Sequence, residues 1–135
     1  MTGKYQDKTI LVTGASRGIG KAIATRFAEQ GAFVIGTATS ENSTAAISET
    51  LNNANGKGAG LVLDISDKNS VEAFAEQLGE YDAPGILINN AGITRDNLLM
   101  RMKDDEWEDV INTNLNGMYR LSRLCLRAMM KARYG

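Results

Sequence analysis

The sequence predicts an α/β fold in which a doubly wound parallel sheet, incomplete and with four strands present, is covered by helices on both faces. Short apolar runs alternate along the chain with longer helical patterns, and this alternation is typical of βαβ units. A glycine-rich turn joins the first apolar run to the first helical pattern. Small, polar or glycine-bearing segments follow each expected strand, and ligands of such sheets bind at those strand ends.

The expected elements follow in a regular order. The first strand is the apolar run 10–12, and residues 18–30 place Ile19, Ile23 and Phe27 on one helical stripe that ends at Gly31. Further strands are expected at 32–37, 59–63 and 86–89, the last of which would be left as an apolar edge. Ser43 and Ser66 are candidate caps of the second and third helices. A long helix is expected from Asp104 to about Arg133.

The composition is that of one ordinary domain. The chain has 135 residues, 43 % of them hydrophobic, and a formal net charge of −1, so no overall charge favours nucleic acid or a membrane as a partner. No apolar run approaches the ~20 residues of a membrane-spanning helix, and residues 1–8 lack the apolar segment of a signal peptide. With the single Cys125 and no histidine, neither a disulfide nor a metal site is expected, which predicts a cytoplasmic protein.

Residues 13–20 form a turn that suits a phosphate group. They follow an apolar strand and lead into a helix, so backbone N–H groups and the positive end of a helix dipole meet there. Gly14 can adopt a positive φ, and the later glycines leave no Cβ between backbone and ligand. The turn is not a Walker loop, because Ala15 and Ala22 replace its first glycine and its hydroxyl residue. A glycine turn without a ligand is the alternative.

Two motifs resemble the short-chain dehydrogenase/reductase family. Thr13 to Gly20 is similar to its cofactor loop, Thr-Gly-x-x-x-Gly-x-Gly, and residues 89–92 are similar to its Asn-Asn-Ala-Gly motif, although a simple turn uses the same residues. The resemblance implies a Rossmann-type fold and a nicotinamide cofactor, with Asn90 beside it and Asn89 serving the sheet. In the family, an aspartate in the place of Asp64 bonds adenine and the next residue contributes backbone. Otherwise Asp64 only helps to start a helix.

The segment after the second strand favours NADP(H). Residues 36–40, Gly-Thr-Ala-Thr-Ser, contain no carboxylate that would bond a ribose 2′-OH and repel a 2′-phosphate. Arg17 and Thr39 suit that phosphate, which carries roughly two negative charges near neutral pH. A solvated loop arginine and a polar strand end are the alternative. The candidate cofactor-binding residues are Gly14, Ala15, Ser16, Arg17, Gly18, Ile19, Gly20, Thr39, Asp64, Ile65, Asn90, Ala91 and Gly92.

Asn114 is the candidate catalytic residue. It falls on an expected buried helical face with Trp107, Leu115 and Met118, where an amide without partners costs roughly 1–3 kcal/mol. Residues 112–115, Asn-Thr-Asn-Leu, resemble the Asn-x-Asn segment of the family, whose second asparagine belongs to a catalytic tetrad. There it disturbs the helix so that a carbonyl holds a water on a proton path. A structural asparagine that kinks the helix is the alternative.

The last expected helix is a candidate interface. Much of its circumference is apolar, and it has a basic rim that includes Lys131 and Arg133. The resemblance implies a homo-oligomer, a tetramer, formed through this helix. We also expect Lys131 and Arg133, near the mouth of the substrate site, to attract an acidic carrier protein. Core packing with a solvated face is the alternative.

Residues 36–40, 89–97 and 98–103 look like the bacterial 3-oxoacyl-(acyl carrier protein) reductase branch, which reduces 3-oxoacyl chains with NADPH in fatty-acid synthesis. The family places a serine and a Tyr-x-x-x-Lys pair after the position of Gly135, and no such pair occurs earlier. The resemblance therefore implies one NADP-binding domain over residues 1–135, the amino-terminal half of an oxidoreductase and inactive alone. The alternatives are a related enzyme acting on acetoacetyl-CoA, a sugar, a steroid or an alcohol, and a catalytically silent nucleotide-binding module.

Overall fold

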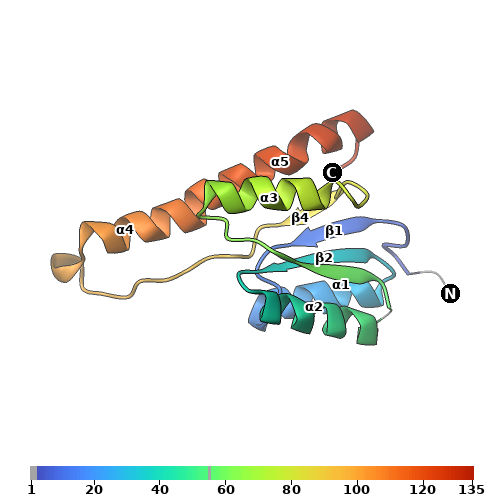
Figure 1. The fold of residues 1–135 in the computed structure, drawn as a ribbon, viewed down its shortest axis with the longest axis horizontal. Helices are drawn as coiled ribbons and strands as arrows, with labels where there is room; N and C mark the ends of the chain where they lie inside the picture. The colour runs from blue at the N-terminus through green and yellow to red at the C-terminus, as the bar shows by residue number, and fades with distance from the viewer. Residues whose placement is uncertain (1–2, 55) are drawn as a thin grey trace.

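A four-stranded parallel sheet forms the centre of the computed structural model, which describes residues 3–54 and 56–135 (Figure 1). Its strands are β1 (Thr9–Val12), β2 (Phe33–Ala38), β3 (Gly58–Val62) and β4 (Ile86–Ile88), in the order β3-β2-β1-β4. In the register, Leu11 lies beside Ile35 on one side and Leu87 on the other. The predicted parallel sheet with β4 at an edge is confirmed.

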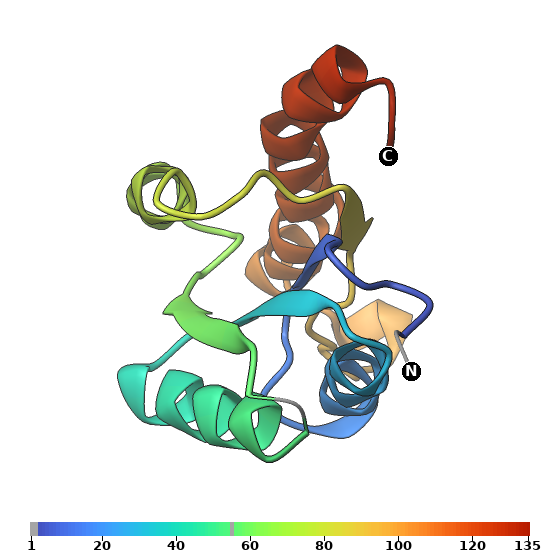
Figure 2. The same ribbon diagram turned by 90° about the vertical axis from the view of Figure 1, so that its right-hand side faces the viewer.

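Helices cover both faces of the sheet, as the prediction of a doubly wound fold requires. Helices α1 (Gly18–Glu29) and α2 (Glu41–Ala54) lie on one face, and α3 (Lys68–Leu78) and α5 (Gly117–Ala132) lie on the other (Figure 2). A short 3₁₀-helix, η1 (Leu99–Arg101), precedes α4 (Asp104–Val110), and the π-helix η2 (Ile111–Asn116) joins α4 to α5. The long helix expected from Asp104 is therefore present, with a π-helical interruption.

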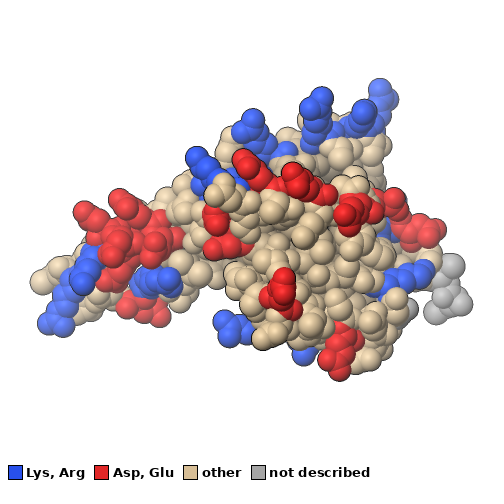
Figure 3. Space-filling view, viewed as in Figure 1, with Lys and Arg blue, Asp and Glu red and all other residues tan. Residues whose placement is uncertain are grey.

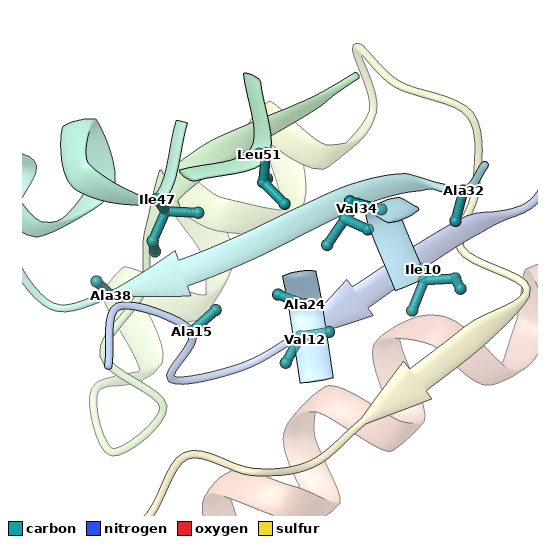
Figure 4. Packing of buried hydrophobic residues seen from close by; sticks show 10 residues of the cluster. Ile10, Val12, Ala15, Ala24, Ala32, Val34, Ala38, Ile47 and Leu51 are labelled. Carbon is teal, nitrogen blue, oxygen red and sulfur yellow. The ribbon is translucent and has the colours of Figure 1, made fainter. Parts of the chain in front are cut away.

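The first core lies between the sheet and helices α1 and α2. Ile10, Val12 and Val34 from the strands meet small alanines of α1 and the larger Ile47 and Leu51 of α2 (Figure 4). Complete burial of a leucine of this kind contributes roughly 1.5–3 kcal/mol. The small side chains of α1 let that helix approach β1 closely, which fixes the direction in which the glycine turn before α1 points.

The second core lies on the opposite face. Leu11 and Ile35 from the strands pack against Phe74 of α3 and against Leu121 and Cys125 of α5. Burial raises the pKa of the Cys125 thiol from its ordinary value of 9.0 to about 11, because the thiolate is poorly solvated there. The strand β1 thus contributes alternate side chains to two separate cores, which is why all four of its residues are buried.

Two predicted helix caps were wrong, by three residues at α2 and by one residue at α3. The Oγ of Ser40 accepts a hydrogen bond from the N–H of Ser43 at 3.3 Å, so Ser40, not Ser43, caps α2. The carboxylate of Asp67 accepts from the N–H of Asn69 at 2.9 Å, so Asp67, not Ser66, caps α3. In both cases the capping residue precedes the first turn, where its side chain reaches the free N–H groups.

The predicted apolar stripe of α1 was wrong at its first residue. Ile19 is 74 % exposed, and the fully buried positions of α1 are Gly20, Ala24 and Ala28. A Cβ built on Gly20 would overlap the carbonyl oxygen of Gly14 and lie 2.5 Å from Asn90 Nδ2. Close packing of α1 therefore selects the smallest residues for the inner face, and the larger Ile19 turns outward.

The expected burial of the face around Asn114 was also wrong. Trp107 is 57 % exposed and Leu115 is 54 % exposed, and Asn114 is exposed as well. Figure 1 shows the reason, because α4 projects beyond the sheet instead of lying on it. The part of α5 that packs on the sheet begins further along the chain, at Leu121 and Cys125. None of the described helices is long and apolar enough to cross a membrane.

Candidate functional site

A cavity of about 1000 Å³ opens at the carboxyl ends of the strands. It lies where the chain order reverses, since β2 and β4 flank β1 on opposite sides, and this is where ligands of open α/β sheets bind. All predicted cofactor-binding residues line it except Ala15 and Gly20. Ala15 belongs to the first core and is 2 % exposed, and Gly20 lies beneath the turn. These two residues shape the turn without facing the cavity.

Some backbone N–H groups of the glycine turn are hydrogen-bonded within the fold, and others are free to bind a ligand. The N–H of Thr13 donates to the Ile88 carbonyl at 3.1 Å, and the N–H of Ala15 donates to the Thr37 carbonyl at 2.9 Å. The N–H of Gly14 donates to Thr37 Oγ1 at 3.2 Å. These three N–H groups are therefore bonded to the neighbouring strands and are not available to a ligand.

The open donors belong to the first turn of α1. This helix begins at Gly18 without a side-chain cap, and the first N–H groups of a helix have no acceptor within it. Gly18 has a φ of +59° and no atom within 4 Å of the place a Cβ would occupy. The N–H groups at residues 18–20 and the positive end of the α1 dipole could thus hold an anion at the cavity.

Thr13 and Asn90 join the glycine turn to the segment after β4. Thr13 Oγ1 accepts from the N–H of Asn90 at 3.0 Å and from the N–H of Ala91 at 2.9 Å. In return, Asn90 Nδ2 donates to the carbonyl oxygens of Thr13 at 3.1 Å and Gly14 at 3.0 Å. Asn89, which was expected to serve the sheet, donates instead to Ser122 Oγ of α5 at 3.2 Å. The two walls of the cavity on this side are therefore one hydrogen-bonded unit.

Arg17 and Thr39 line the same cavity. Arg17 precedes α1 and Thr39 follows β2, and both side chains belong to exposed residues that line the cavity. The carboxylates that line it are those of Asp64 and Asp109, neither of which lies at the end of β2. The end of β2 is thus open to a negatively charged group.

The carboxylate of Asp64 accepts hydrogen bonds from within its own loop. Its Oδ1 accepts from the N–H of Ser66 at 3.0 Å and from the Ser66 hydroxyl at 2.6 Å. The N–H of Asp64 donates to Ser70 Oγ of α3 at 2.8 Å. Asp67 has the helix-capping role, so Asp64 determines the shape of the loop between β3 and α3 at the edge of the cavity.

Asn114 holds a backbone segment and does not itself line the cavity. It lies in the π-helix η2, where its Oδ1 accepts from the N–H of Ile93 at 2.8 Å and its Nδ2 donates to the Ile93 carbonyl at 2.9 Å. Ile93 lines the cavity. The expectation that this amide is bonded within the fold is met, although the residue is exposed. A π-helical turn changes the direction of side chains relative to an α-helix, and such turns are frequent at functional sites.

Lys131 and Arg133 lie far from the cavity, so the expected position near its mouth was wrong. They are at the carboxyl end of α5, where the neighbouring Tyr134 ring lies 4.0 Å from Lys8 Nζ and close to Gly85. Lys8 and Gly85 precede β1 and β4, at the amino ends of the strands. The helix α5 runs the length of the sheet, which carries its last turn to the end opposite the cavity.

Sequence reasoning missed several residues of the site. Thr37 accepts the Gly14 N–H, Asn112 and Thr113 line the cavity, and Arg95 lies 3.9 Å from Asp109 at its edge. The contacts of Gly14 with Thr37 and of Arg95 with Asp109 join different segments, and the spacing within each segment does not predict them. Asn112 and Thr113 belong to the Asn-x-Asn segment, from which only Asn114 was selected. Within residues 3–54 and 56–135, no three His, Cys, Asp or Glu side chains lie together as metal ligands.

The parallel sheet, the glycine turn that leads into α1 and the cavity at the strand ends define a Rossmann-type α/β domain. A model of the short chain dehydrogenase family matches residues 8–135. The chain belongs to the short-chain dehydrogenase family, as its motifs predicted, and this membership implies a nicotinamide cofactor.

The chain is similar to bacterial proteins named 3-oxoacyl-[acyl-carrier-protein] reductase FabG. The protein from Pseudomonas aeruginosa is 61% identical over 132 residues, 96% of this chain and 53% of the relative. That from Escherichia coli K12 is 58% identical over 132 residues, 97% of this chain and 53% of the relative. That from Vibrio harveyi is 61% identical over 131 residues, 96% of this chain and 52% of the relative. The chain spans about half the length of these relatives.

Proposed function

We propose that this chain is the cofactor-binding half of an NADPH-dependent 3-oxoacyl-(acyl carrier protein) reductase, which forms 3-hydroxyacyl chains in fatty-acid synthesis. Identities of 58–61% to reductases with that printed name support the proposal. Proteins of this family use the cofactor to deliver hydride to a carbonyl carbon. The residues described here bind and orient that cofactor.

The residues around the cavity fit a dinucleotide whose adenosine end lies toward β2 and β3 and whose nicotinamide end lies toward β4. The diphosphate would lie against the N–H groups at the start of α1. The 2′-phosphate would lie between Arg17 and Thr39, and the adenine would lie beside Asp64 and Ile65. The ribose and nicotinamide would extend past Asn90 to the backbone of Ala91 and Gly92, which lie on the β4 side of the glycine turn.

The observation that carries the choice of coenzyme is the charge at the end of β2. Arg17 and Thr39 line the cavity there, and residues 36–40 contain no carboxylate. A 2′-phosphate gains a guanidinium and a hydroxyl at this position, whereas NADH leaves the guanidinium without an anionic partner. The same open position would tolerate NADH but would not select it.

Calorimetric titration of the full-length protein with NADPH and with NADH tests the proposal. We expect NADPH to bind the wild type at least tenfold more tightly, and Arg17→Gln to lose most of this preference, roughly 10- to 100-fold in NADPH affinity. Arg26→Gln is the matched control, because Arg26 is exposed on the same helix and pairs with Glu29. Equal affinity of the wild type for both nucleotides would contradict the choice of coenzyme. No affinity for either would overturn the proposed function.

Asn114 acts in this proposal as a positioning residue. The ketone of the substrate needs a proton donor as the alkoxide develops, and no Tyr, Lys or His is among the residues that line the cavity. We therefore expect the 135 residues alone to be inactive toward acetoacetyl thioesters. Asn114 would hold the segment at Ile93 in place, and a backbone carbonyl of the π-helix would hold a water on the path of the proton.

The exposed side of α4 and α5 supports a homo-oligomer, which we propose to be a tetramer in the cytoplasm. Trp107, Leu126 and Met130 are 57 %, 53 % and 69 % exposed on these helices, and exposed apolar groups of this size mark interaction surfaces. Light scattering of the full-length protein tests this, with Leu126→Asp expected to shift the mass to a smaller species. An unchanged mass would exclude Leu126 from the interface.

The carrier protein would dock through the carboxyl end of α5. Figure 3 shows basic side chains over α5 and acidic side chains over the projecting α4. An acidic carrier is attracted to the former and repelled by the latter. An acyl carrier protein holds its acyl chain covalently at the end of a flexible arm, so the surface on which it docks can lie away from the cavity. Lys131 and Arg133 therefore remain candidate contacts for the carrier.

A further inference from the structure

The loop between β3 and α3 is held from outside by two side chains. Arg120 belongs to no motif, and Asn112 is the first asparagine of the Asn-x-Asn segment, to which no role was assigned. Arg120 Nη1, from α5, donates to the Ile65 carbonyl at 3.0 Å, and Asn112 Nδ2, from η2, donates to the Ser66 carbonyl at 3.0 Å. Arg120 Nη2 also donates to Asn112 Oδ1 at 3.2 Å. The two side chains and the two carbonyl groups thus form one connected cluster, and Ile65, Ser66 and Asn112 line the cavity.

Packing brings α5 against the loop at the same place. A Cβ built on Gly117 would lie 2.8 Å from Ile65 Cδ1, so the helix backbone rests directly on the Ile65 side chain. Ile65 is 6 % exposed and belongs to the second core. The side chain of Ile65 is therefore fixed by packing, and its carbonyl is fixed by the guanidinium of Arg120.

The choice of partners for Arg120 is unusual for a half-buried cation. Neither ion pair among the described residues includes Arg120, and its two acceptors are the neutral oxygens of Ile65 and Asn112. Two parallel donors in a rigid plane fix the direction of both acceptors, which a lysine ammonium does not do. This arrangement specifies the position of the loop more than it stabilises the fold through charge.

We propose that Arg120 and Asn112 are positioning residues for the adenosine end of the cofactor. They hold the backbone at Ile65 and Ser66 at the distance from the end of β2 that leaves room for the adenine. This inference rests on the proposed binding of NADPH and assigns a role to residues outside the cofactor motifs. Arg120 does not line the cavity, so it acts through the loop.

The cluster also connects the two ends of the cavity. Asn112 and Asn114 lie in the same π-helix, and each uses its amide to bind the backbone of a different cavity wall. Asn112 binds Ser66 on the adenosine side, and Asn114 binds Ile93 on the nicotinamide side. The π-helix therefore sets the spacing between the two walls.

Titration of the full-length protein with NADPH, with 2′,5′-ADP and with nicotinamide mononucleotide tests the proposal. We expect Arg120→Met to weaken binding of NADPH and of 2′,5′-ADP roughly tenfold, and to leave the affinity for nicotinamide mononucleotide within about twofold because that half does not reach the loop. Arg120→Lys should recover part of the loss, since an ammonium can still donate to one carbonyl.

Arg123→Met is the matched control. Arg123 lies on the same helix, is exposed and donates to Tyr119 Oη at 3.3 Å, without contact to the loop. Its variant should bind all three ligands like the wild type. If Arg120→Met does not fold, Asn112→Ala decides the matter, because it removes the bond to Ser66 and leaves the packing of Ile65 intact.

The outcomes are distinguishable from a failure of the proposed function. Wild-type protein that binds none of the ligands would overturn the proposed function itself. If the wild type binds NADPH and both variants, Arg120→Met and Asn112→Ala, bind 2′,5′-ADP as tightly as the wild type does, only the positioning role is overturned. Equal weakening of both half-molecules would also overturn it, because general loss of structure affects both ends of the cavity.

Discussion

The amide of Asn114 binds both backbone polar groups of Ile93, at 2.8 Å to its N–H and 2.9 Å to its carbonyl. This pair of bonds imitates the pairing between two strands, although one partner is a side chain of a π-helix. It holds the segment after β4, where regular pairing has ended. The position of Gly92 is affected too, since a Cβ there would lie 3.1 Å from Asn114 Oδ1.

Asn114→Ala should lower turnover more than cofactor binding. The variant releases the segment at Ile93, so we expect kcat of the full-length protein with acetoacetyl thioester to fall roughly 10- to 100-fold. The KM for NADPH should change less than kcat, since the segments proposed to bind the diphosphate, the 2′-phosphate and the adenine are not those that Asn114 holds. Steady-state kinetics measure both quantities. Asn52→Ala, at an exposed position of α2, is the control, and an unchanged kcat in Asn114→Ala would remove the positioning role.

Gly20→Ala should disrupt the glycine turn. The added Cβ would overlap the Gly14 carbonyl, so either α1 or the turn must move, at a cost of about 1–3 kcal/mol. We expect a lower free energy of unfolding in urea and loss of NADPH affinity. Gly79→Ala is the matched control, because Gly79 has a φ of −62° and its Cβ would lie 3.3 Å from the nearest backbone oxygen. Wild-type affinity in Gly20→Ala would show that the close approach is not required.

The Cys125 thiol should react slowly with iodoacetamide in the folded protein. Burial raises its pKa from 9.0 to about 11, which lowers the reactive thiolate fraction roughly 100-fold at pH 8. Mass spectrometry of the peptide that contains Cys125 measures the rate, with the protein in urea as the control. Equal rates in the folded and urea-treated protein would contradict burial of this thiol.

The same raised pKa makes stability depend on pH in the alkaline range. The folded state retains the thiol proton at a pH where the unfolded chain has lost it, so this contribution to stability is complete below about pH 9. It is lost as the pH rises toward 11. The wild type should therefore lose stability relative to Cys125→Ala as the pH rises from 9.0 to about 11. The difference between their urea unfolding midpoints measures this loss and should stay constant at lower pH.

Reversal of the charges at Lys131 and Arg133 should affect the carrier-bound substrate selectively. We expect Lys131→Glu with Arg133→Glu to raise the KM for acetoacetyl carrier protein roughly tenfold at low salt and to leave the KM for acetoacetyl-CoA unchanged. The control reverses Arg26 and Lys68, which lie on α1 and α3. Unchanged kinetics on the carrier-bound substrate would exclude this end of α5 as the docking surface.

The sheet could be predicted because its signal is local. The runs at β1 and β2 are largely apolar, with Gly14 shortly after β1 and Gly31 shortly before β2. A buried parallel strand shows such an apolar run whatever surrounds it. The face of α1 could not be read in the same way. Hydrophobicity alone places Ile19 inside, whereas the distance between α1 and the glycine turn admits only Gly20 and alanines.

The candidate site could be predicted in part for a similar reason. The residues that follow the strands meet at one cavity because strand ends of a parallel sheet lie together. The contact of Arg120 with Ile65 joins positions 55 residues apart, and that of Asn112 with Ser66 joins positions 46 apart. No spacing along the chain distinguishes Arg120 from the solvated polar residues around it, and the Asn-x-Asn segment does not indicate the partner of Asn112. The two contacts become visible only when α5 is placed against the loop.

The three consecutive amide protons at Thr13, Gly14 and Ala15 are bonded to the strands on either side of β1. Such protons exchange with deuterated solvent only when β2 and β4 separate from the central strand, which amounts to global opening of the sheet. The base of the glycine turn should therefore be among the slowest-exchanging places in the molecule, although it borders an open cavity. A ligand seated there meets a rigid floor that costs little ordering entropy on binding.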